Sequence, residues 1–136
     1  MSTRCEIIIK DYETDKKTGK KHKWKVTLYH HCDGYPNGVG RFLMDTVYPK
    51  LVSSNNADID VIANLLIKNR EDTGFELTCY KHVDIQYRYI IDIPKKEIMC
   101  YEGQYDSWES DNSRFKATGK ENLLHFLPLK IAETYA

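Results

Sequence analysis

The chain has 136 residues, of which 41% are hydrophobic and 12% aromatic, and this composition supports a folded core and excludes an intrinsically disordered chain. Twenty Lys and Arg side chains balance twenty Asp and Glu side chains, whereas a dedicated nucleic-acid-binding protein usually carries a basic surplus. The length suits one domain over residues 1–136, and the charge argues against nucleic acid as the partner without excluding a local basic patch.

The four cysteines are spread along the chain, and no two of them form a C-x-x-C pair, which argues against a zinc knuckle or a thioredoxin-type redox motif. They are Cys5, Cys32, Cys79 and Cys100. No apolar signal segment follows Met1, and no apolar run approaches the length of a membrane span. We therefore expect free thiols, no membrane association and a cytoplasmic location.

The N-terminal part of the chain predicts a β-hairpin. Residues 4–12 and 22–31 both alternate between apolar and polar side chains, which is the period of a strand with one buried face. The polar segment 13–21 between them contains Gly19 and predicts a turn. Two strands joined in this way should pair antiparallel.

Lysines gather at the tip of this hairpin, namely Lys16, Lys17, Lys20, Lys21, Lys23 and Lys25. A basic cluster of this kind can contact phosphates. However, Asp11, Glu13 and Asp15 lie beside it in the sequence, and we expect no aromatic side chains to interleave with the lysines as stacking on a single strand would require. We interpret the cluster as a solvated tip whose lysines discourage edge pairing, although the exposed edge could pair between chains in a homo-oligomer.

Two helical segments follow the hairpin. The first helix should begin near Asn37 and end before Pro49, because apolar residues recur at helical spacing between them. After a polar break, Asn55 is a suitable N-cap for the second helix, and Asp58 lies near the positive end of that helix. The second helix carries an apolar stripe formed by Ile59, Ile62, Ala63 and Leu66.

The second half of the chain predicts strands over residues 75–80, 82–93 and 97–102, with a turn at residues 94–96. Residues 103–121 are polar, and we expect a long loop there. The order of the elements predicts an α+β fold. In this fold an antiparallel sheet consists of the N-terminal hairpin and a C-terminal meander, and two helices pack on one of its faces.

The most unusual part of the sequence is the segment 29–40, Tyr-His-His-Cys-Asp-Gly-Tyr-Pro-Asn-Gly-Val-Gly, which joins the hairpin to the first helix. Gly34 permits a positive φ in the turn. Glycines at a helix start leave backbone N–H groups exposed at the positive end of the helix, where an anion or phosphate could bind. The alternative is a tight strand-to-helix turn in which Asp33 bonds to its own backbone, and the sequence leaves both interpretations open.

We predict a ligand-binding site in this segment. Asp33 would accept hydrogen bonds from a base or a sugar, and the N–H groups from Gly38 to Arg41 would meet an anion, with Arg41 as its charge partner. The neighbouring aromatic rings could stack on a base. The candidate binding residues are Tyr29, His31, Asp33, Gly34, Tyr35, Gly38, Gly40 and Arg41.

The same segment holds side chains that can ligate a metal or act as a nucleophile, namely His30, His31, Cys32 and Asp33. Adjacent strand residues point to opposite faces, so one site could use only alternate members such as His31 with Asp33, and no metal-ligand spacing is complete. Cys32 could act as a nucleophile with His30 as its base, but a lone cysteine at a strand end is more often a small buried hydrophobe. We therefore expect neither a metal nor a cofactor.

The residues from His31 to Gly40 resemble a motif, His-Trp-Asp-Gly-Tyr-Pro-x-Gly-Val-Gly, of a family of small proteins from phages, prophages and bacterial mobile elements. Cys32 stands in place of the aromatic residue of that motif. Residues 83–92 look like a second recurring stretch of the family, an Asp-Ile-x-Tyr-x-Tyr-x-Ile-Asp strand. The family has no assigned catalytic role, and the resemblance implies a phage-type accessory protein that counters a host defence.

Three functions are consistent with these observations. The one that we favour is a non-enzymatic binding protein that takes a phosphorylated small molecule, such as a nucleotide signal of a defence system, at the turn from Asp33 to Gly40. The second is an inhibitor that binds a host defence protein through the acidic segment 103–113. The third is a small hydrolase that uses His31 and Asp33.

Overall fold

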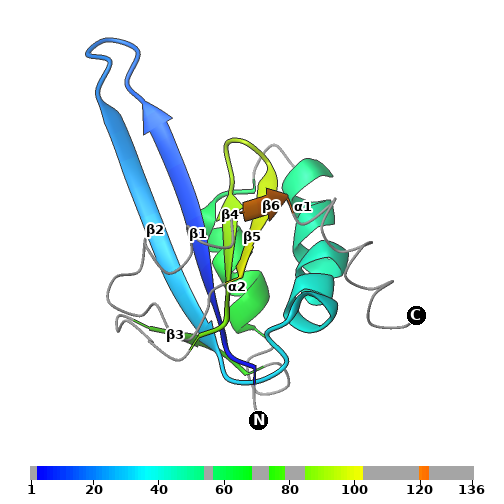
Figure 1. Ribbon diagram of the computed structural model, residues 1–136. Coiled ribbons are helices and arrows are strands. Elements are labelled where there is room, and N and C mark those ends of the chain that lie inside the picture. The colour runs from blue at the N-terminus through cyan, green and yellow to red at the C-terminus, as the bar shows by residue number, and fades with distance from the viewer. Residues whose placement is uncertain (1–2, 54–56, 69–73, 79–84, 103–119, 123–136) are drawn as a thin grey trace.

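The computed structural model describes residues 3–53, 57–68, 74–78, 85–102 and 120–122, and the elements follow one another in an α+β order (Figure 1). The strands are β1 (Cys5–Thr14), β2 (Lys21–His30), β3 (Phe75–Leu77), β4 (Tyr87–Asp92), β5 (Glu97–Glu102) and β6 (Lys120–Asn122). The helical elements are η1 (Pro36–Gly40), η2 (Leu43–Val47), α1 (Tyr48–Ser53) and α2 (Ile59–Ile67). The predicted α+β class is confirmed.

The six strands form one sheet in the order β3-β2-β1-β4-β5-β6. All neighbouring pairs are antiparallel except β1 and β4, which run parallel. The prediction of a purely antiparallel sheet is therefore wrong at this one boundary. The N-terminal hairpin and the C-terminal strands meet there, and the helices lie in the long crossover connection that a parallel pair requires.

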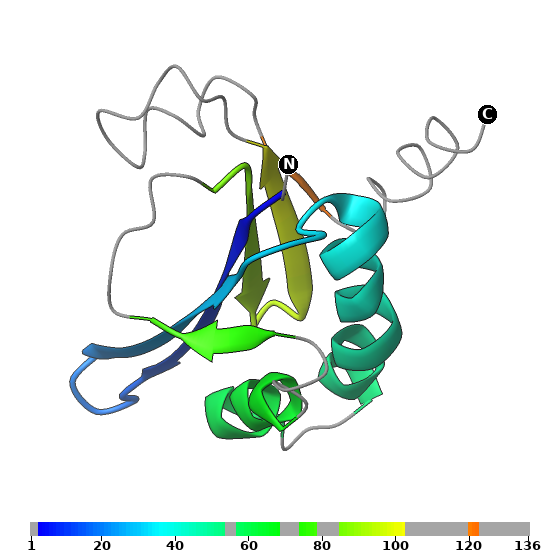
Figure 2. The ribbon, with the colours of Figure 1, turned by 90° about the horizontal axis from the view of Figure 1, so that it is seen from below.

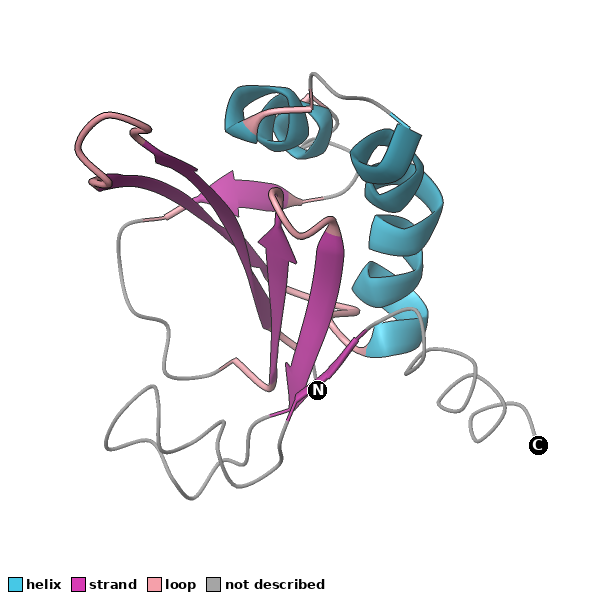
Figure 3. Ribbon diagram, turned by 90° about the horizontal axis from the view of Figure 1, so that it is seen from above, coloured by secondary structure: helices cyan, strands magenta, loops and turns pink. Residues whose placement is uncertain are grey.

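Both helical segments cover the same face of the sheet, as predicted (Figures 2 and 3). The alternation of β1 and β4 turns their apolar side chains toward the helices. From the sheet, the core contains Cys5, Ile7, Ile9, Leu28, Phe75, Tyr89, Ile91, Ile98 and Cys100. From the helical side, it contains Val39, Leu43, Val47, Leu51, Ile62, Ala63 and Leu66.

The first helical segment is longer than the sequence predicts, because η1, η2 and α1 follow one another and the helix passes through Pro49 to Ser53. The backbone N–H of Tyr48 donates to the carbonyl of Leu43, five residues back, which forms a wide π-helical turn. A wider turn at this point accommodates the ring of Pro49, which in a regular helix would clash with the carbonyl four residues before it.

The second helix also begins later than predicted. Its N-cap is Asp58, whose Oδ1 accepts a hydrogen bond of 3.0 Å from the backbone N–H of Val61. Asn55, the predicted cap, lies outside the described residues. Aspartate satisfies an N-cap as well as asparagine does, and its charge also suits the positive helix end, so the later carboxylate caps the helix.

The C-terminal strands are shorter than the predicted runs and include one that the sequence did not indicate. β3 ends at Leu77, β4 spans only Tyr87–Asp92, and residues 79–84 lie outside the described part of the chain. Lys120–Asn122 pairs with β5 as β6, although the sequence predicts a loop up to residue 121. A three-residue polar strand carries too little periodicity to be recognised from sequence.

A row of side chains crosses the sheet on the face opposite the helices. Glu6 lies beside Tyr29 on one side and Arg88 on the other, and Tyr101 is the next residue in register. Arg88 Nε donates to Glu6 Oε1 at 2.8 Å, and both side chains are more than nine-tenths buried. Opposite charges in this position join β1 to β4 across the parallel boundary.

Within the part of the chain that the structure describes, no helix has the length and apolar character needed to span a membrane.

The ion pair between Glu6 and Arg88 should be costly to break but not to replace. Arg88→Ala leaves a buried carboxylate unpaired, and we expect the free energy of unfolding in urea to fall by about 3–5 kcal/mol. The double variant Glu6→Leu/Arg88→Met removes both charges, and we expect it to recover most of that loss.

The matched control is Arg41→Ala, which breaks an exposed pair with Asp45 at 3.8 Å and should cost less than about 1 kcal/mol. Equal losses for Arg88→Ala and Arg41→Ala would contradict a structural role for the buried pair.

Candidate functional site

The turn between β2 and η1 is shaped by two neighbouring residues with different tasks. Asp33 takes the left-handed conformation, with φ of 55°, which aspartate and asparagine tolerate better than other non-glycine residues. The prediction of a positive φ at Gly34 is therefore wrong by one residue. Gly34 is needed for space instead, because a Cβ there would lie 2.7 Å from Cys5 Cβ and 2.9 Å from the Thr3 carbonyl oxygen.

Gly34 is bonded to the chain on both sides. Its N–H donates to the Thr3 carbonyl at 2.8 Å, and its carbonyl accepts a buried hydrogen bond of 2.7 Å from the hydroxyl of Tyr89. Burial raises the pKa of Tyr89 well above its usual value, so this hydroxyl remains protonated and can donate. The start of β1, the turn and β4 are thereby joined at one residue.

The start of the helix is closed by the same turn. The Asp33 carbonyl accepts the Val39 N–H at 2.9 Å, and the Gly38 N–H donates to the Tyr35 carbonyl at 2.9 Å. A Cβ on Gly38 would overlap the Asp33 carbonyl oxygen. The Arg41 N–H points back to carbonyls of the same helix. Three of the N–H groups predicted to meet an anion are therefore already hydrogen-bonded within the chain.

The Asp33 carboxylate lies at the surface, where its Oδ1 accepts a hydrogen bond of 3.1 Å from the Tyr35 hydroxyl. This side-chain bond takes the place of the Asx-type bond that the tight-turn interpretation predicts. The carboxylate has further lone pairs that face solvent, because an ionised carboxylate offers about four acceptor positions.

A pocket of about 310 Å³ opens beside this turn. Two phenylalanines and a histidine form its aromatic part: the Phe42 and Phe75 ring centres lie 5.4 Å apart, and those of His30 and Phe75 lie 4.6 Å apart. Exposed Cys32 and Asp33 lie at its polar edge. The complete lining is His30, Cys32, Asp33, Gly38, Val39, Phe42 and Phe75.

Of the eight predicted binding residues, Asp33 and Gly38 line this pocket. Tyr29 is buried on the opposite face of the sheet, where it packs with Ile85 and lies edge-on to His31 at 6.1 Å. The remaining predicted residues have roles in the turn or face solvent. Gly34 and Gly40 are buried, Tyr35 is exposed and bonds to Asp33, and Arg41 is exposed and pairs with Asp45.

Five pocket residues were not among the predicted binding residues. His30 and Cys32 share a strand face, which the alternation of β2 could have indicated. Val39 and Phe42 belong to the apolar helix face and resemble ordinary core residues. Phe75 arrives through the pairing of β3 with β2, in which it lies opposite His30, and a three-residue strand gives no sequence signal for that partner.

The described residues give little support to the alternative functions, namely a metal site, a cysteine nucleophile, a hydrolase or a protein-binding inhibitor. Among the described residues, no three His, Cys, Asp or Glu side chains come together as a metal site. Cys32 is exposed, so its interpretation as a buried hydrophobe is wrong. His31 and Asp33, the pair predicted for a hydrolase, are both exposed. The acidic segment 103–113 predicted for a protein-binding inhibitor lies outside the described residues.

No protein-family model, curated protein or solved structure matches this chain.

The bond between Tyr89 and Gly34 should hold the turn in place. Tyr89→Phe leaves the buried Gly34 carbonyl without its donor, and we expect the free energy of unfolding to fall by about 1–3 kcal/mol. Tyr87→Phe is the matched control, because the Tyr87 hydroxyl reaches only Glu102 at 3.4 Å near the surface and its loss should cost less than about 0.5 kcal/mol.

Gly34→Ala adds a test of the close approach to Cys5, with Gly19→Ala as its control. Gly19 has φ of 71° and no atom within 4 Å of its Cβ position, so only the backbone conformation is strained there. Gly34→Ala should destabilise more than Gly19→Ala, and the opposite order in urea unfolding would refute the role of Gly34 as the junction.

Proposed function

We propose that this protein is a non-enzymatic binding protein that takes a small planar ligand, such as the base of a nucleotide, into the pocket beside Asp33. The observation that carries the proposal is the pairing of aromatic side chains with a solvent-facing carboxylate in one small cavity. The half-buried Phe42 ring can stack on a planar group, whereas the Phe75 and His30 rings are buried, and a few polar groups at the edge of an apolar pocket orient the ligand.

The size of the pocket supports a small ligand. A volume of about 310 Å³ lies at the lower end of the range for small-molecule sites, about 300–1,000 Å³. A base or nucleoside fits this range better than a large cofactor does. In the proposal the Asp33 carboxylate accepts hydrogen bonds from an amino group of the base or from a sugar hydroxyl.

A phosphate group would be met by a side chain in this proposal. The N–H groups of Gly38, Val39 and Arg41 already donate hydrogen bonds to carbonyls of the chain, so they are poor donors for a bound anion. The Arg41 guanidinium is more than half exposed, and its pair with Asp45 at 3.8 Å is a weak surface contact. Arg41 can therefore turn toward a phosphate without breaking a strong interaction.

The resemblance to proteins of phages and mobile elements extends the proposal to a biological role. In that role the ligand is a nucleotide signal of a host defence system, and the protein sequesters it in the host cytosol. Sequestration needs only binding and no chemical step.

The proposal predicts stabilisation by ligand. Thermal unfolding is measured with a panel of nucleobases, nucleosides, nucleotides and cyclic nucleotides. A member present at a hundred times its dissociation constant should stabilise the fold by about 2.7 kcal/mol, which raises Tm by several degrees. Asp33→Asn should reduce this shift, because it removes the charge while asparagine still tolerates the positive φ. Asp60→Asn, on the first turn of α2, is the control and should keep the shift.

A second readout uses the exposed thiol at the pocket edge. In a Cys79→Ser background, the two other described cysteines, Cys5 and Cys100, are buried, so alkylation should start at Cys32. A ligand that raises Tm should also slow the alkylation of Cys32. A panel in which no member raises Tm and none protects Cys32 would overturn the proposed function.

A further inference from the structure

The outer half of the β1–β2 hairpin separates its charges by face. Lys10 and Tyr12 alternate with Asp11 and Glu13 along β1, so the two acidic side chains belong to the same strand face as the core residue Ile9. The lysines belong to the opposite face, away from the helices. The acidic residues that appear to neutralise the cluster in the sequence therefore do not share its face.

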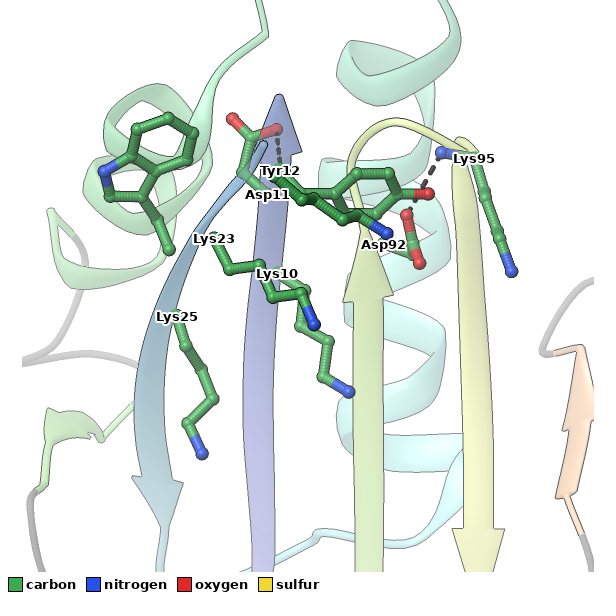
Figure 4. A pocket seen from close by; sticks show the side chains of 9 residues that line it. Lys10, Asp11, Tyr12, Lys23, Lys25, Asp92 and Lys95 are labelled. Atoms are coloured by element: carbon green, nitrogen blue, oxygen red, sulfur yellow. Dashed lines mark hydrogen bonds between the residues drawn. The ribbon is translucent and has the colours of Figure 1, made fainter. Parts of the chain in front are cut away.

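The register of the hairpin brings lysines of both strands together. Lys10 lies opposite Lys25, and Tyr12 lies opposite Lys23. Lys95 approaches from the turn after β4 and lines the same depression, whose volume is about 400 Å³ (Figure 4). We call this surface the basic face, which consists of Lys10, Lys21, Lys23, Lys25 and Lys95.

The basic face carries a local surplus of positive charge in a protein whose net charge is zero. Asp92 and, from the other strand face, Asp11 line the same depression as its five lysines, which leaves three unbalanced positive charges. Asp92 also accepts the backbone N–H of Lys95 at 3.1 Å in the β4–β5 turn. Such a concentration of lysines attracts a polyanion over distances of about a Debye length.

Two aromatic side chains adjoin the lysines, and one of them, Trp24, stands between Lys23 and Lys25 in the sequence itself, so the expectation that no aromatic residue interleaves with the lysines is wrong. The Lys21 ammonium lies 4.0 Å above the centre of the Tyr12 ring. Trp24 lies opposite Asp11 in the hairpin register and so belongs to the other face of β2, but it lines the same depression at the outer edge of the strand and is 47% exposed. An indole left this open to water is available to stack on a base, which is the contact that single-stranded ligands add to phosphate binding.

The open edge of β2 lets one ligand reach both the lysines and Trp24. β3 pairs only with Leu28–His30, so within the described residues the part of β2 from Lys21 to Val26 has no strand on its outer side. Figure 1 shows this half of the hairpin projecting beyond the rest of the sheet. A chain laid along this edge would meet Lys23 and Lys25, about 6.6 Å apart along the strand, and could place a base on Trp24.

We propose that the basic face binds single-stranded nucleic acid, with the lysines on successive phosphates and Trp24 stacked on a base. The exposed indole favours a single strand over a duplex, whose bases are already stacked. This surface lies at the Lys21 end of β2, whereas the pocket of the proposed function lies at the His30 end. The inference goes beyond the proposed function and does not depend on it.

The test is fluorescence anisotropy of the whole chain with a short labelled oligothymidylate at several salt concentrations. Each lysine–phosphate contact contributes about 0.7 to the slope of log K against log salt for a single strand. Lys23→Ala/Lys25→Ala should therefore lower the slope by about 1.4 and weaken binding at low salt by at least tenfold. The control Lys50→Ala/Lys68→Ala removes the same charge from an exposed position of α1 and from the exposed C-cap of α2, and it should change neither the slope nor the affinity.

Trp24→Ala distinguishes stacking from charge. It should weaken binding about tenfold without changing the salt slope, because it removes a base contact and no phosphate contact. Absence of binding by the parent protein at low salt, or equal losses in both lysine double variants, would overturn the proposal. Equal affinity for a blunt duplex together with no effect of Trp24→Ala would overturn the assignment to a single strand.

Discussion

The arrangement of the sheet and the first helix depends on the close contact of Gly34 with the start of β1. The Gly34 N–H reaches the Thr3 carbonyl, its carbonyl accepts the Tyr89 hydroxyl, and its missing side chain leaves room for Cys5. Because Cys5 and Tyr89 belong to the two parallel strands, the turn fixes the helix start against both. The pocket follows from this contact, since the same turn places Asp33 and Val39 beside the aromatic residues of β2 and β3.

Local patterns in the sequence predicted the parts of the fold that depend on neighbouring residues. The hairpin, the two helical segments and the strands β3, β4 and β5 follow from periodicity, and the α+β class follows from the order of these elements. The parallel pairing of β1 with β4 depends on where a distant strand inserts, which no local pattern encodes. The passage of the helix through Pro49 depends on a wide turn before it, and propensity alone predicts an end there.

The same difference between local patterns and long-range pairing explains which residues of the site the sequence could predict. The sequence located the turn and Asp33, because glycines, a proline and polar residues gather there. It did not locate Phe75, which reaches the pocket through a three-residue strand paired with His30. It also placed Asp11 and Glu13 beside the lysines, whereas strand alternation puts them on the other face. Two separate surfaces result, one at each end of β2.

The most direct test of the account is an amide NMR titration that maps where a small planar ligand binds. The protein is titrated with a mixture of the four common ribonucleoside monophosphates, and the backbone signals are followed residue by residue. Binding in the pocket predicts shifts that concentrate at the turn and on the facing strand, around Asp33, Val39 and Phe75. Shifts confined to the lysines of the hairpin, or no shifts at saturating concentrations, would contradict the claim that the turn beside Gly34 forms a binding pocket.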